Sequence, residues 1–525
     1  MSARLMLGNE AIAAGAYDAG VGFVSSYPGT PSTEITEYIA EYDVYAEWAP
    51  NEKVAVECAL GASVAGVRAL AAMKHVGLNV AADPLFTASY TGVNGGLVIC
   101  VADDPGMHSS QNEQDSRHYA RASKIIMLEP SDSAECYAFT KAAFDISERF
   151  DTPVIIRLTT RVAHSRSSVE TTGKSSVSRR EYTKNIGKYV MMPAMARGRH
   201  KFIEQRGESI VSFSETSDLN NIEYNDKKIG VITSGICYQY AREALGDTAS
   251  YLKLGIVWPL ADKLINEFID NVEQCWVLEE LDPFIEQYVR AGRISDIRGK
   301  NMFTMLGEYS ARMIKSVVLG AENKFLALDN LPVRPPALCN GCPHTKVFEA
   351  LKSIDGLIIT GDIGCYTLGA LPPLSMLDTC VCMGASVSMA HGMLKAQTGE
   401  SKIVSVLGDS TFIHSGITGL INMVYNKSPG TVLILDNSTT GMTGHQDNPA
   451  TGLTLKGEPT WPLNLEKLCE AVGVRRVVTV DPYNAEEIRA AILNETAANE
   501  PSVVICRRPC VLLKAKQNRS KSHQA

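Results

Sequence analysis

The segment from Lys402 to Asn448 constrains the fold more than any other part of the chain. An apolar run, Ile403 to Leu407, ends at Gly408-Asp409-Ser410, and a second run, Thr431 to Leu435, ends at Asp436-Asn437. Between the two runs, apolar side chains recur at helical spacing, at Ile417, Leu420, Ile421 and Val424. This order predicts a strand, a loop, a helix and a second strand, which is the repeating unit of a parallel sheet.

Polar residues follow both strands at their carboxyl ends. Neighbouring strands of a parallel sheet end at the same edge, so Asp409 and Asn437 are expected to meet there although 28 positions separate them. Carboxylate and amide oxygens are ligands for Mg²⁺, and a helix N-terminus beside them favours an anionic diphosphate. The alternative is that these residues only terminate two buried strands, as Gly, Asp and Asn often do.

Composition narrows the class of protein. The chain has 525 residues, 45% of them hydrophobic and 21% charged, which predicts a globular protein of about three or four domains. The net charge of −8 argues against nucleic acid or an anionic membrane as a partner, and the basic tail Lys514 to Lys521 is expected to be solvated. No apolar stretch reaches transmembrane length and no signal peptide is evident, so a cytoplasmic location is expected. The 13 cysteines, an odd number, favour reduced thiols or metal ligation over disulfides.

The alternation of helical patterns with short apolar runs predicts an α/β fold with parallel sheets. Residues 1–165 and 226–325 both carry this alternation. The segment 166–225 is polar and basic, and it predicts a linker with a short helical arm. Residues 335–515 form the domain that contains Asp409 and Asn437, and 516–525 form a tail.

Two stretches of the first domain carry candidate functional residues. The strand GFVSSYP runs into Tyr27 to Glu34, where two prolines and a glycine force a turn and Ser32 or Thr33 can cap the next helix. Glu52 lies in the first turn of a helix rich in small residues. From the sequence alone, Glu52 is most simply a charge that complements the helix dipole.

These motifs resemble a known family. YPGTPSTE, NEKVAVECALGASVAG, MKHVGLNVAADP and DDPGMHSSQNEQDSR resemble the pyrimidine-binding half of the 2-oxoacid:ferredoxin oxidoreductases, most closely the large subunits of the indolepyruvate type. GDS followed by DN resembles the thiamine diphosphate motif, with Ser410 in place of its usual last glycine. The resemblance extends over essentially the whole chain and includes GDIGCYTLG. It implies two thiamine-diphosphate-binding-type parallel-sheet domains, pyrimidine-binding at 1–165 and diphosphate-binding at 335–515, with a smaller transketolase-C-terminal-like α/β domain at 226–325.

For the first domain, the resemblance implies a catalytic glutamate that hydrogen-bonds the aminopyrimidine ring of thiamine diphosphate. Glu52 and Glu57 both stand near the expected position, and the alignment with the family's Gly-Ala pair favours Glu52. Thr30 is expected to hydrogen-bond the substrate's carboxylate or keto oxygen. Arg117 and Arg121 are candidates for bidentate recognition of the substrate carboxylate, with surface salt bridges as the alternative.

For the diphosphate-binding domain, the resemblance implies that Asp409 and Asn437 bind Mg²⁺ through their side chains and Thr439 through its backbone carbonyl. His445 is expected to make a polar contact, or to be an ordinary loop histidine. The other residues expected at the cofactor are Gly408, Ser410, Gly364, Cys365, Met383 and Gly384.

Four cysteines match positions that hold a 4Fe-4S iron–sulfur cluster in related enzymes. They are Cys339 and Cys342 of CNGCPH, Cys365 of GDIGC, and Cys510 in the Pro-Cys after the last strand. Thiolates are suitable ligands for iron, and a nearby cluster can accept electrons singly. CNGCPH departs from the usual CPGC, and buried cysteines also occur simply as small apolar residues.

The implied reaction is oxidative decarboxylation of an aryl 2-oxoacid to an acyl-CoA, with electrons passed to ferredoxin or a similar carrier. The 525 residues contain no CxxCxxCxxxCP run, so electrons are expected to leave through another subunit or a docked carrier, unless the chain is truncated or has lost oxidative activity. Glu52 and Asp409 fall in different domains, and in thiamine enzymes the two domains that hold one cofactor usually come from two protomers. The resemblance therefore implies a homodimer, within a heterotetramer whose smaller subunit completes the coenzyme A site. A non-oxidative thiamine-dependent decarboxylase and a non-catalytic subunit remain as alternatives, and the particular 2-oxoacid stays open.

Overall fold

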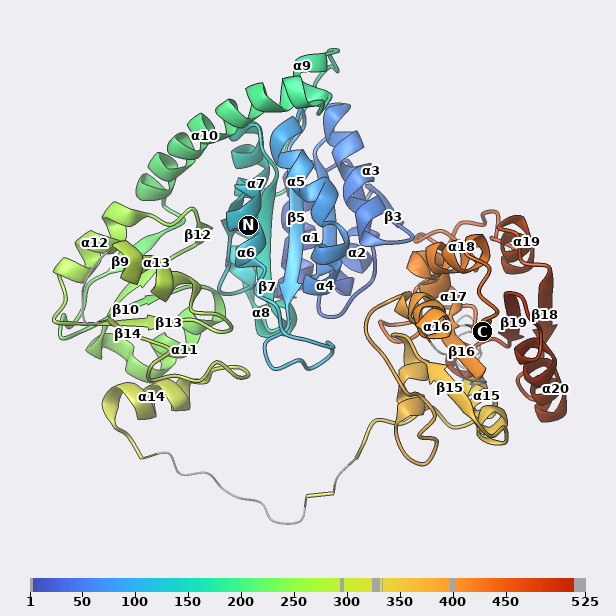
Figure 1. Cartoon of the computed structure of the whole chain (residues 1–525). Coiled ribbons are helices and arrows are strands. Elements are labelled where there is room, and N and C mark those ends of the chain that lie inside the picture. The colour runs from blue at the N-terminus through green and yellow to red at the C-terminus, as the bar shows by residue number, and fades with distance from the viewer. Residues whose placement is uncertain (1–2, 293–296, 323–330, 333, 397–401, 514–525) are drawn as a thin grey trace, which may run out of the picture. The chain divides into compact units, whose positions relative to one another are not determined.

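The computed structural model describes residues 3–292, 297–322, 331–332, 334–396 and 402–513. The chain divides into two compact units, Met1–Ala327 and Leu328–Ala525, which are described separately (Figure 1). Both units contain parallel strands connected by helices, so the predicted α/β class is confirmed. The basic tail, Lys514 to Lys521, lies outside the described residues. Among the described helices, none combines the length and the apolar character needed to span a membrane.

The first unit contains a seven-stranded sheet in the order β12-β6-β7-β5-β4-β2-β3. Its strands pair in parallel except for β12, which pairs antiparallel with β6. The central strands are buried on both faces, which explains their nearly continuous apolar sequences. The strands are β2 (Phe23–Ser26), β3 (Tyr45–Trp48), β4 (Ala69–Lys74), β5 (Leu97–Asp103), β6 (Ile126–Leu128), β7 (Val154–Thr159) and β12 (Ile256–Trp258).

Helices separate these strands, and the loops at the strands' carboxyl ends form one edge of the sheet. The helices are α1 (Gly8–Asp18), α2 (Thr33–Ile39), α3 (Glu52–Val64), α4 (His75–Val80), α5 (Ala82–Thr91), α6 (Arg117–Ser123), α7 (Ser133–Phe150) and α8 (Thr160–His164). A separate two-stranded sheet joins β1 (Ala3–Leu7) to β8 (Arg166–Glu170). Residues 166–170, which were expected in the linker, therefore pair with the first domain.

The helical arm after this domain is longer than the sequence suggested. The short helix α9 (Ile186–Tyr189) precedes α10 (Pro193–Thr216), which has 24 residues (Figure 1). Arg206 of α10 donates hydrogen bonds to the carbonyls of Ser89 and Asp151 at 3.1 and 2.8 Å. These contacts fix the arm to the first domain.

A second sheet in the same unit has the order β14-β13-β10-β11-β9. Its strands are β9 (Asn221–Glu223), β10 (Ile229–Thr233), β11 (Ser250–Lys253), β13 (Gln274–Leu278) and β14 (Ile297–Arg298). Its helices are α11 (Gly235–Leu245), α12 (Asp262–Asp270), α13 (Phe284–Gly292) and α14 (Ala311–Leu319). Because β12 lies between β11 and β13 in sequence but pairs with β6, this domain contributes a strand to the first sheet.

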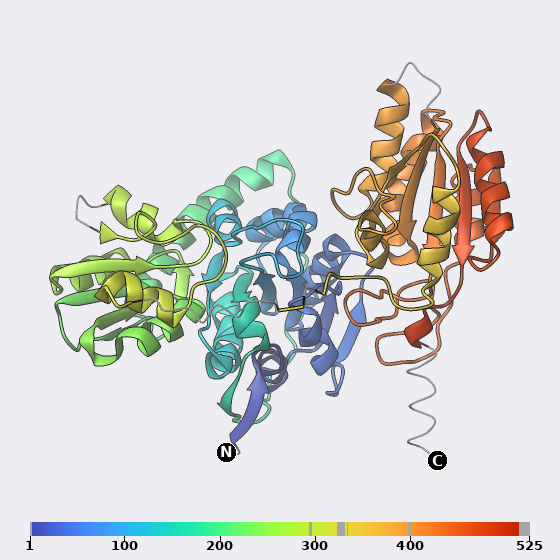
Figure 2. The same ribbon diagram turned by 90° about the horizontal axis from the view of Figure 1, so that it is seen from below.

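The second unit contains one fully parallel sheet in the order β15-β16-β17-β19-β18. Helices α16 and α18 pack together, as do α15 and α20, and the strands lie between helices in Figure 2. The strand, loop, helix and strand predicted for Lys402 to Asn448 are confirmed. The elements are α15 (Pro343–Lys352), β15 (Leu357–Thr360), a 3₁₀ turn (Cys365–Ala370), α16 (Ala385–Ala396), β16 (Lys402–Gly408), α17 (Asp409–Thr411), a π-helical turn (Phe412–Gly416), α18 (Ile417–Tyr425), β17 (Thr431–Asp436), α19 (Leu465–Ala471), β18 (Arg476–Val480), α20 (Ala485–Thr496) and β19 (Ser502–Arg507).

Candidate functional site

Asp409 and Asn437 lie together at the carboxyl edge of the second unit's sheet. Strands β16 and β17 are neighbours, with Gly408 opposite Leu435, so the residues that follow both strands reach the same edge. Both side chains are buried, at 2% and 8% exposure. The Asn448 amide donates to Asp409 Oδ2 at 3.1 Å, and the Thr439 backbone N–H donates to Asn437 Oδ1 at 3.3 Å. Asn448 is not among the residues predicted from the sequence, although it ends the TGHQDN stretch that contains His445.

The electrostatics of this edge suit a divalent cation. Burial, reinforced by the neighbouring Asp436, raises the pKa of Asp409 to about 7, although the hydrogen bond from Asn448 opposes this shift. Asp436 is itself paired with Arg507, whose Nε lies 2.7 Å from Asp436 Oδ2. A hard cation beside Asp409 and the Asn437 amide oxygen would stabilise the ionised carboxylate.

The other expected cofactor residues surround this edge. Gly408 and Gly364 both lie against the ring of Tyr366, and a Cβ on Gly408 would come within 2.8 Å of it. Gly384 has φ of +82°, and a Cβ there would lie 2.3 Å from Ser415 Oγ. The small residues therefore keep the backbone close to its neighbours.

Asp362 holds the loop that contains Met383 and Gly384. Its carboxylate accepts the backbone N–H groups of Gly384 at 2.8 Å and Ser386 at 2.9 Å. Ser410 Oγ accepts a hydrogen bond from the Thr440 hydroxyl at 2.9 Å, which joins the loops after β16 and β17. Asp362 is not among the predicted site residues, although its Gly-Asp pair at the end of a strand repeats the pattern of Gly408-Asp409.

All four candidate cluster ligands line one cavity in the second unit. Cys339 and Cys342 lie just before α15, with Cys342 as its N-cap, Cys365 begins the 3₁₀ turn, and Cys510 follows β19. The cavity has a volume of about 170 Å³ and is also lined by Asn437 and His445. The rest of its lining is largely apolar: Ala337, Leu338, Pro343, Leu368, Val511 and Leu512, with His344 and Gly441.

The spacing of the thiols distinguishes between kinds of metal site. Tetrahedral zinc, with Zn–S bonds of about 2.3 Å, requires sulfur atoms roughly 4 Å apart. Among the described residues, one group of three or more His, Cys, Asp or Glu side chains has ligand atoms within 4.8 Å of one another. It consists of Asp115, His118 and Asp282 and contains no cysteine. Burial and the neighbouring thiols raise the pKa of Cys365 to about 11, so this thiol is protonated near pH 7 until a metal displaces its proton. Among the described residues these thiols do not meet in such a compact set, so they are not placed as the ligands of one zinc ion; the cavity that they line could hold a polynuclear cluster.

His344 connects the cysteine cavity to the Asn437 side chain. The ring is buried, and its Nε2 lies 3.3 Å from Asn437 Nδ2. Burial lowers the pKa of His344 to about 4, so the imidazole is neutral near pH 7 and can accept from the amide. His344 is not among the predicted site residues, although it directly follows CNGCP.

In the first unit, Glu52 and Glu57 have different environments. Glu52 is 3% exposed at the start of α3, and Asn51 caps that helix by accepting the Val54 N–H at 2.9 Å. A Cβ on Gly77 of α4 would lie only 2.6 Å from Glu52 Oε1. Glu57 is exposed and ion-paired with Lys53. Of the two, only Glu52 faces the interior near the carboxyl edge of the sheet.

Thr30 lies in the turn after β2, near the same edge. Its carbonyl accepts a hydrogen bond from Ser109 Oγ at 3.3 Å, and the Ser109 carbonyl accepts one from Lys74 Nζ at 2.8 Å. Lys74, the last residue of β4, was not among the expected site residues. Its position in MKHVGLN, at the end of a buried apolar run, is the signal in the sequence that points to it.

The expectation for Arg117 requires correction. Its side chain is 1% exposed and ion-paired with Asp115 and with Glu279, each at 2.5 Å. These carboxylates enclose the guanidinium, so Arg117 joins the two domains of the first unit and does not present a free group to a substrate. Arg121 is exposed, with its guanidinium 5.8 Å from the centre of the Trp258 ring.

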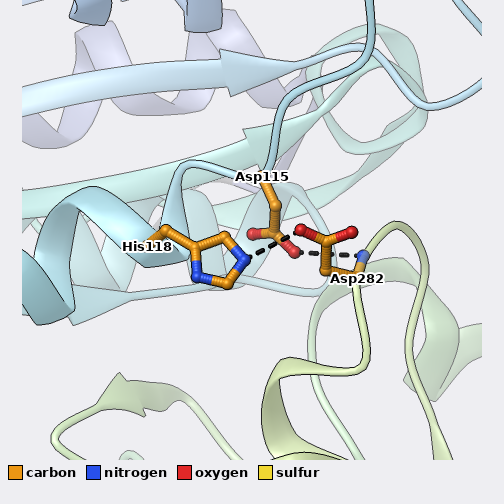
Figure 3. A group of neighbouring side chains, drawn as sticks. All are labelled: Asp115, His118 and Asp282. Atoms are coloured by element: carbon orange, nitrogen blue, oxygen red, sulfur yellow. Dashed lines mark hydrogen bonds and ion pairs between the residues drawn. The ribbon is translucent and has the colours of Figure 1, made fainter.

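Figure 3 shows the acidic group around this junction, where Asp115, His118 and Asp282 point toward one another. The Asp282 backbone N–H donates to Asp115 Oδ2 at 3.3 Å, and His118 Nε2 lies 2.8 Å from Asp282 Oδ2. Burial opposes ionisation of Asp115, but Arg117 and Arg157 outweigh burial and lower its pKa. The protein's own cations thus already balance this carboxylate.

Comparisons with known proteins identify the type of both domains. Residues 14–228 match the model described as pyruvate flavodoxin/ferredoxin oxidoreductase, thiamine diP-bdg. Residues 362–506 match the model described as thiamine pyrophosphate enzyme, C-terminal TPP binding domain. The first match includes Glu52 and Thr30, and the second includes Asp409 and Asn437. Both halves of the chain are therefore of the thiamine-diphosphate-binding type.

Relatives extend over almost the entire chain. The chain is 41% identical to the indolepyruvate oxidoreductase subunit IorA of Archaeoglobus fulgidus, over 98% of this chain and 87% of that protein. It is 40% identical to the same subunit of Pyrococcus horikoshii, over 99% and 87%. A solved 2-oxoglutarate:ferredoxin oxidoreductase from Magnetococcus marinus, with 2-oxoglutarate, coenzyme A and succinyl-CoA bound, shares the fold at 19% identity and a TM-score of 0.52, over 61% of this chain and 65% of that chain. The chain belongs to the family of IorA subunits of indolepyruvate oxidoreductases.

Proposed function

We propose that this chain is the thiamine-diphosphate-binding subunit of an enzyme that oxidatively decarboxylates aryl 2-oxoacids of the indolepyruvate type. Coenzyme A and a one-electron carrier such as ferredoxin are the co-substrates. A 2-oxoacid anion, coenzyme A and two oxidised carriers give an acyl-CoA, CO₂, two reduced carriers and a proton. Coenzyme A in the Magnetococcus marinus structure and the names of the relatives support this assignment.

Thiamine diphosphate, when bound, supplies a carbon nucleophile for the keto group and stabilises the negative charge that remains after CO₂ leaves. Glu52 would hydrogen-bond the pyrimidine ring through its buried carboxylate, which Gly77 leaves room for. Asp409, Asn437 and the Thr439 carbonyl would hold Mg²⁺ against the diphosphate, with Gly408, Ser410, Gly364, Met383 and Gly384 forming the surrounding backbone. Thr30 would contact the substrate.

One observation favours oxidation over simple decarboxylation. The cavity lined by Cys339, Cys342, Cys365 and Cys510 also contains Asn437, the proposed Mg²⁺ ligand. A cluster held by these thiols would lie beside the diphosphate end of the cofactor and could accept electrons singly. A decarboxylase that releases an aldehyde has no need of such a cavity.

Two kinds of partner follow from this proposal. Glu52 belongs to the first unit and Asp409 to the second, and the cofactor requires both. In thiamine enzymes these two domains usually come from two protomers, so we infer that two copies of the chain complete each other's sites. A smaller subunit would complete the coenzyme A site in a heterotetramer. Electrons would leave through that subunit or through a docked carrier.

The test is an anaerobic assay of the chain co-purified with its smaller subunit. Thiamine diphosphate, Mg²⁺ and indolepyruvate are supplied, with and without coenzyme A, and reduction of a viologen dye is followed. Dye reduction that depends on coenzyme A is expected. Aldehyde release without dye reduction would overturn the proposed oxidation in favour of the non-oxidative decarboxylase.

Two variants assign the residues. Glu52→Gln is expected to lower kcat at least about 100-fold, because the carboxylate acts at the cofactor, whereas Glu57→Gln on the same helix is expected to retain wild-type activity. Cys342→Ser is expected to remove the brown colour, the iron and the EPR signal of the cluster. Full activity in Glu52→Gln, or an iron-free wild-type enzyme with full activity, would contradict these assignments.

A further inference from the structure

Lys74 lies at the same edge of the first unit's sheet as Glu52 and the Thr30 turn, and the Glu52 charge acts on its amine. It is the last residue of β4, which pairs with β2, and β2 leads into the Thr30 turn. Its amine donates to the Ser109 carbonyl at 2.8 Å, and the Ser109 hydroxyl donates to the Thr30 carbonyl at 3.3 Å. One serine therefore links the lysine to the turn that is expected to contact the substrate.

The lysine's alkyl chain is fixed by packing as well as by this hydrogen bond. Gly29 lies against it so closely that a Cβ on Gly29 would be 3.1 Å from Lys74 Cγ and 3.2 Å from Cδ. A side chain held along its stem loses less conformational entropy when its ammonium binds a ligand. Lys74 is thus preorganised at the carboxyl edge of the sheet.

The charge of Lys74 is incompletely balanced by the protein. Burial lowers its pKa, and the charges of Asp104 and Glu52 offset only part of that effect. Asp104 accepts hydrogen bonds from the Ser109 N–H at 2.8 Å and from the Ser110 hydroxyl at 2.7 Å, which satisfy its carboxylate locally. Within the described part of the chain, Lys74 forms no ion pair at 4.0 Å or less. A bound anion would supply the missing partner.

The substrate of the proposed reaction is such an anion. Arg117 is enclosed by Asp115 and Glu279, and Arg121 lies over Trp258, so neither expected arginine is joined to the Thr30 turn in this way. We propose that Lys74 binds the carboxylate of the 2-oxoacid and thereby selects for 2-oxoacids over uncharged carbonyl compounds. This inference rests on the proposed function and names the residue that recognises its substrate class.

The test separates binding of the charge from catalysis. Lys74→Met in the complete enzyme is expected to raise KM for indolepyruvate about 10- to 100-fold, the effect of one charged hydrogen bond, with kcat within about threefold of wild type. Lys74→Arg is expected to restore most of the affinity. Lys201→Met, which removes a charge from the exposed face of α10, is the control and is expected to leave KM unchanged.

A binding measurement provides a readout other than turnover. Indole-3-lactate, a non-reacting acid, is expected to bind Lys74→Met about 10- to 100-fold more weakly than wild type, whereas its methyl ester binds both alike. A loss of kcat at constant KM, or equal losses of affinity for acid and ester, would overturn the role of Lys74. If wild type turns over no 2-oxoacid, the proposed function itself fails; if wild type is active and Lys74→Met has wild-type KM, only this inference fails.

Discussion

Glu280→Gln is expected to remove part of the pH dependence of the first unit's stability. Glu280 follows β13 and is buried, and it accepts the Tyr309 backbone N–H at 2.8 Å. Burial raises its pKa from 4.5 to about 7, and the nearby carboxylate of Glu308 adds to the shift. A glutamine retains the oxygen that accepts from Tyr309 but carries no proton that titrates, so the substitution removes only the ionisation.

The sign and size follow from linkage. Because the folded-state pKa is raised, the stabilising contribution of Glu280 is fully present below pH 4.5 and is lost as the pH rises through 7. A difference of 2.5 pH units corresponds to a limit of about 3 kcal/mol, of which about 2 kcal/mol is lost between pH 5.5 and 8.5. The free energy of unfolding of Glu280→Gln minus that of wild type is therefore expected to be about 2 kcal/mol larger at pH 8.5 than at pH 5.5, because only wild type loses stability over this range.

Urea titrations at the two pH values, followed by tryptophan fluorescence, measure this difference. Trp276 is 1% exposed in β13, near Glu280 in sequence, and reports on unfolding of this domain. Glu273→Gln, at an exposed position of the same domain, is the control and is expected to show no pH-dependent difference. An equal effect of Glu280→Gln at both pH values would refute the reasoning.

Two further substitutions test the sites. Gly77→Ala is expected to displace the Glu52 carboxylate, because the new Cβ would lie 2.6 Å from Oε1, and thereby to lower kcat at least about tenfold. Gly61→Ala is the matched control. A Cβ at Gly61 meets open space, so this variant is expected to retain activity in the same assay. His344→Phe is expected to weaken Mg²⁺-dependent binding of thiamine diphosphate about tenfold in fluorescence titrations, because the Asn437 amide loses its acceptor. Unchanged affinity in the folded variant would exclude this role for His344.

The sequence was sufficient to predict the parts of the fold that depend on local pattern. The runs Ile403 to Leu407 and Thr431 to Leu435 are buried strands, and their pairing brings Asp409 and Asn437 to one edge as the parallel topology requires. The cysteines were found through their spacing relative to family motifs, and the structure brings all four to one cavity.

Features that depend on distant partners were not predictable from pattern. Arg117 lies in a polar stretch typical of a surface, but it is buried because it pairs with Glu279, 162 positions away. His344 contacts Asn437 across 93 positions. The length of α10 was missed because its buried face contains only two apolar residues, Ile203 and Ile210, alongside Arg206 and Ser214, so the apolar repeat is weak.

The strand β12 has a consequence for how this protein can be divided or expressed. Because Ile256–Trp258 covers the side of β6 that would otherwise be a free sheet edge, a polypeptide that stops before β12 would leave backbone N–H and C=O groups of β6 without partners. These unpaired groups can form hydrogen bonds with strands of other chains. The domain that contains this seven-stranded sheet is therefore expected to aggregate when produced alone, and the smallest soluble fragment of the first unit is expected to extend through α14.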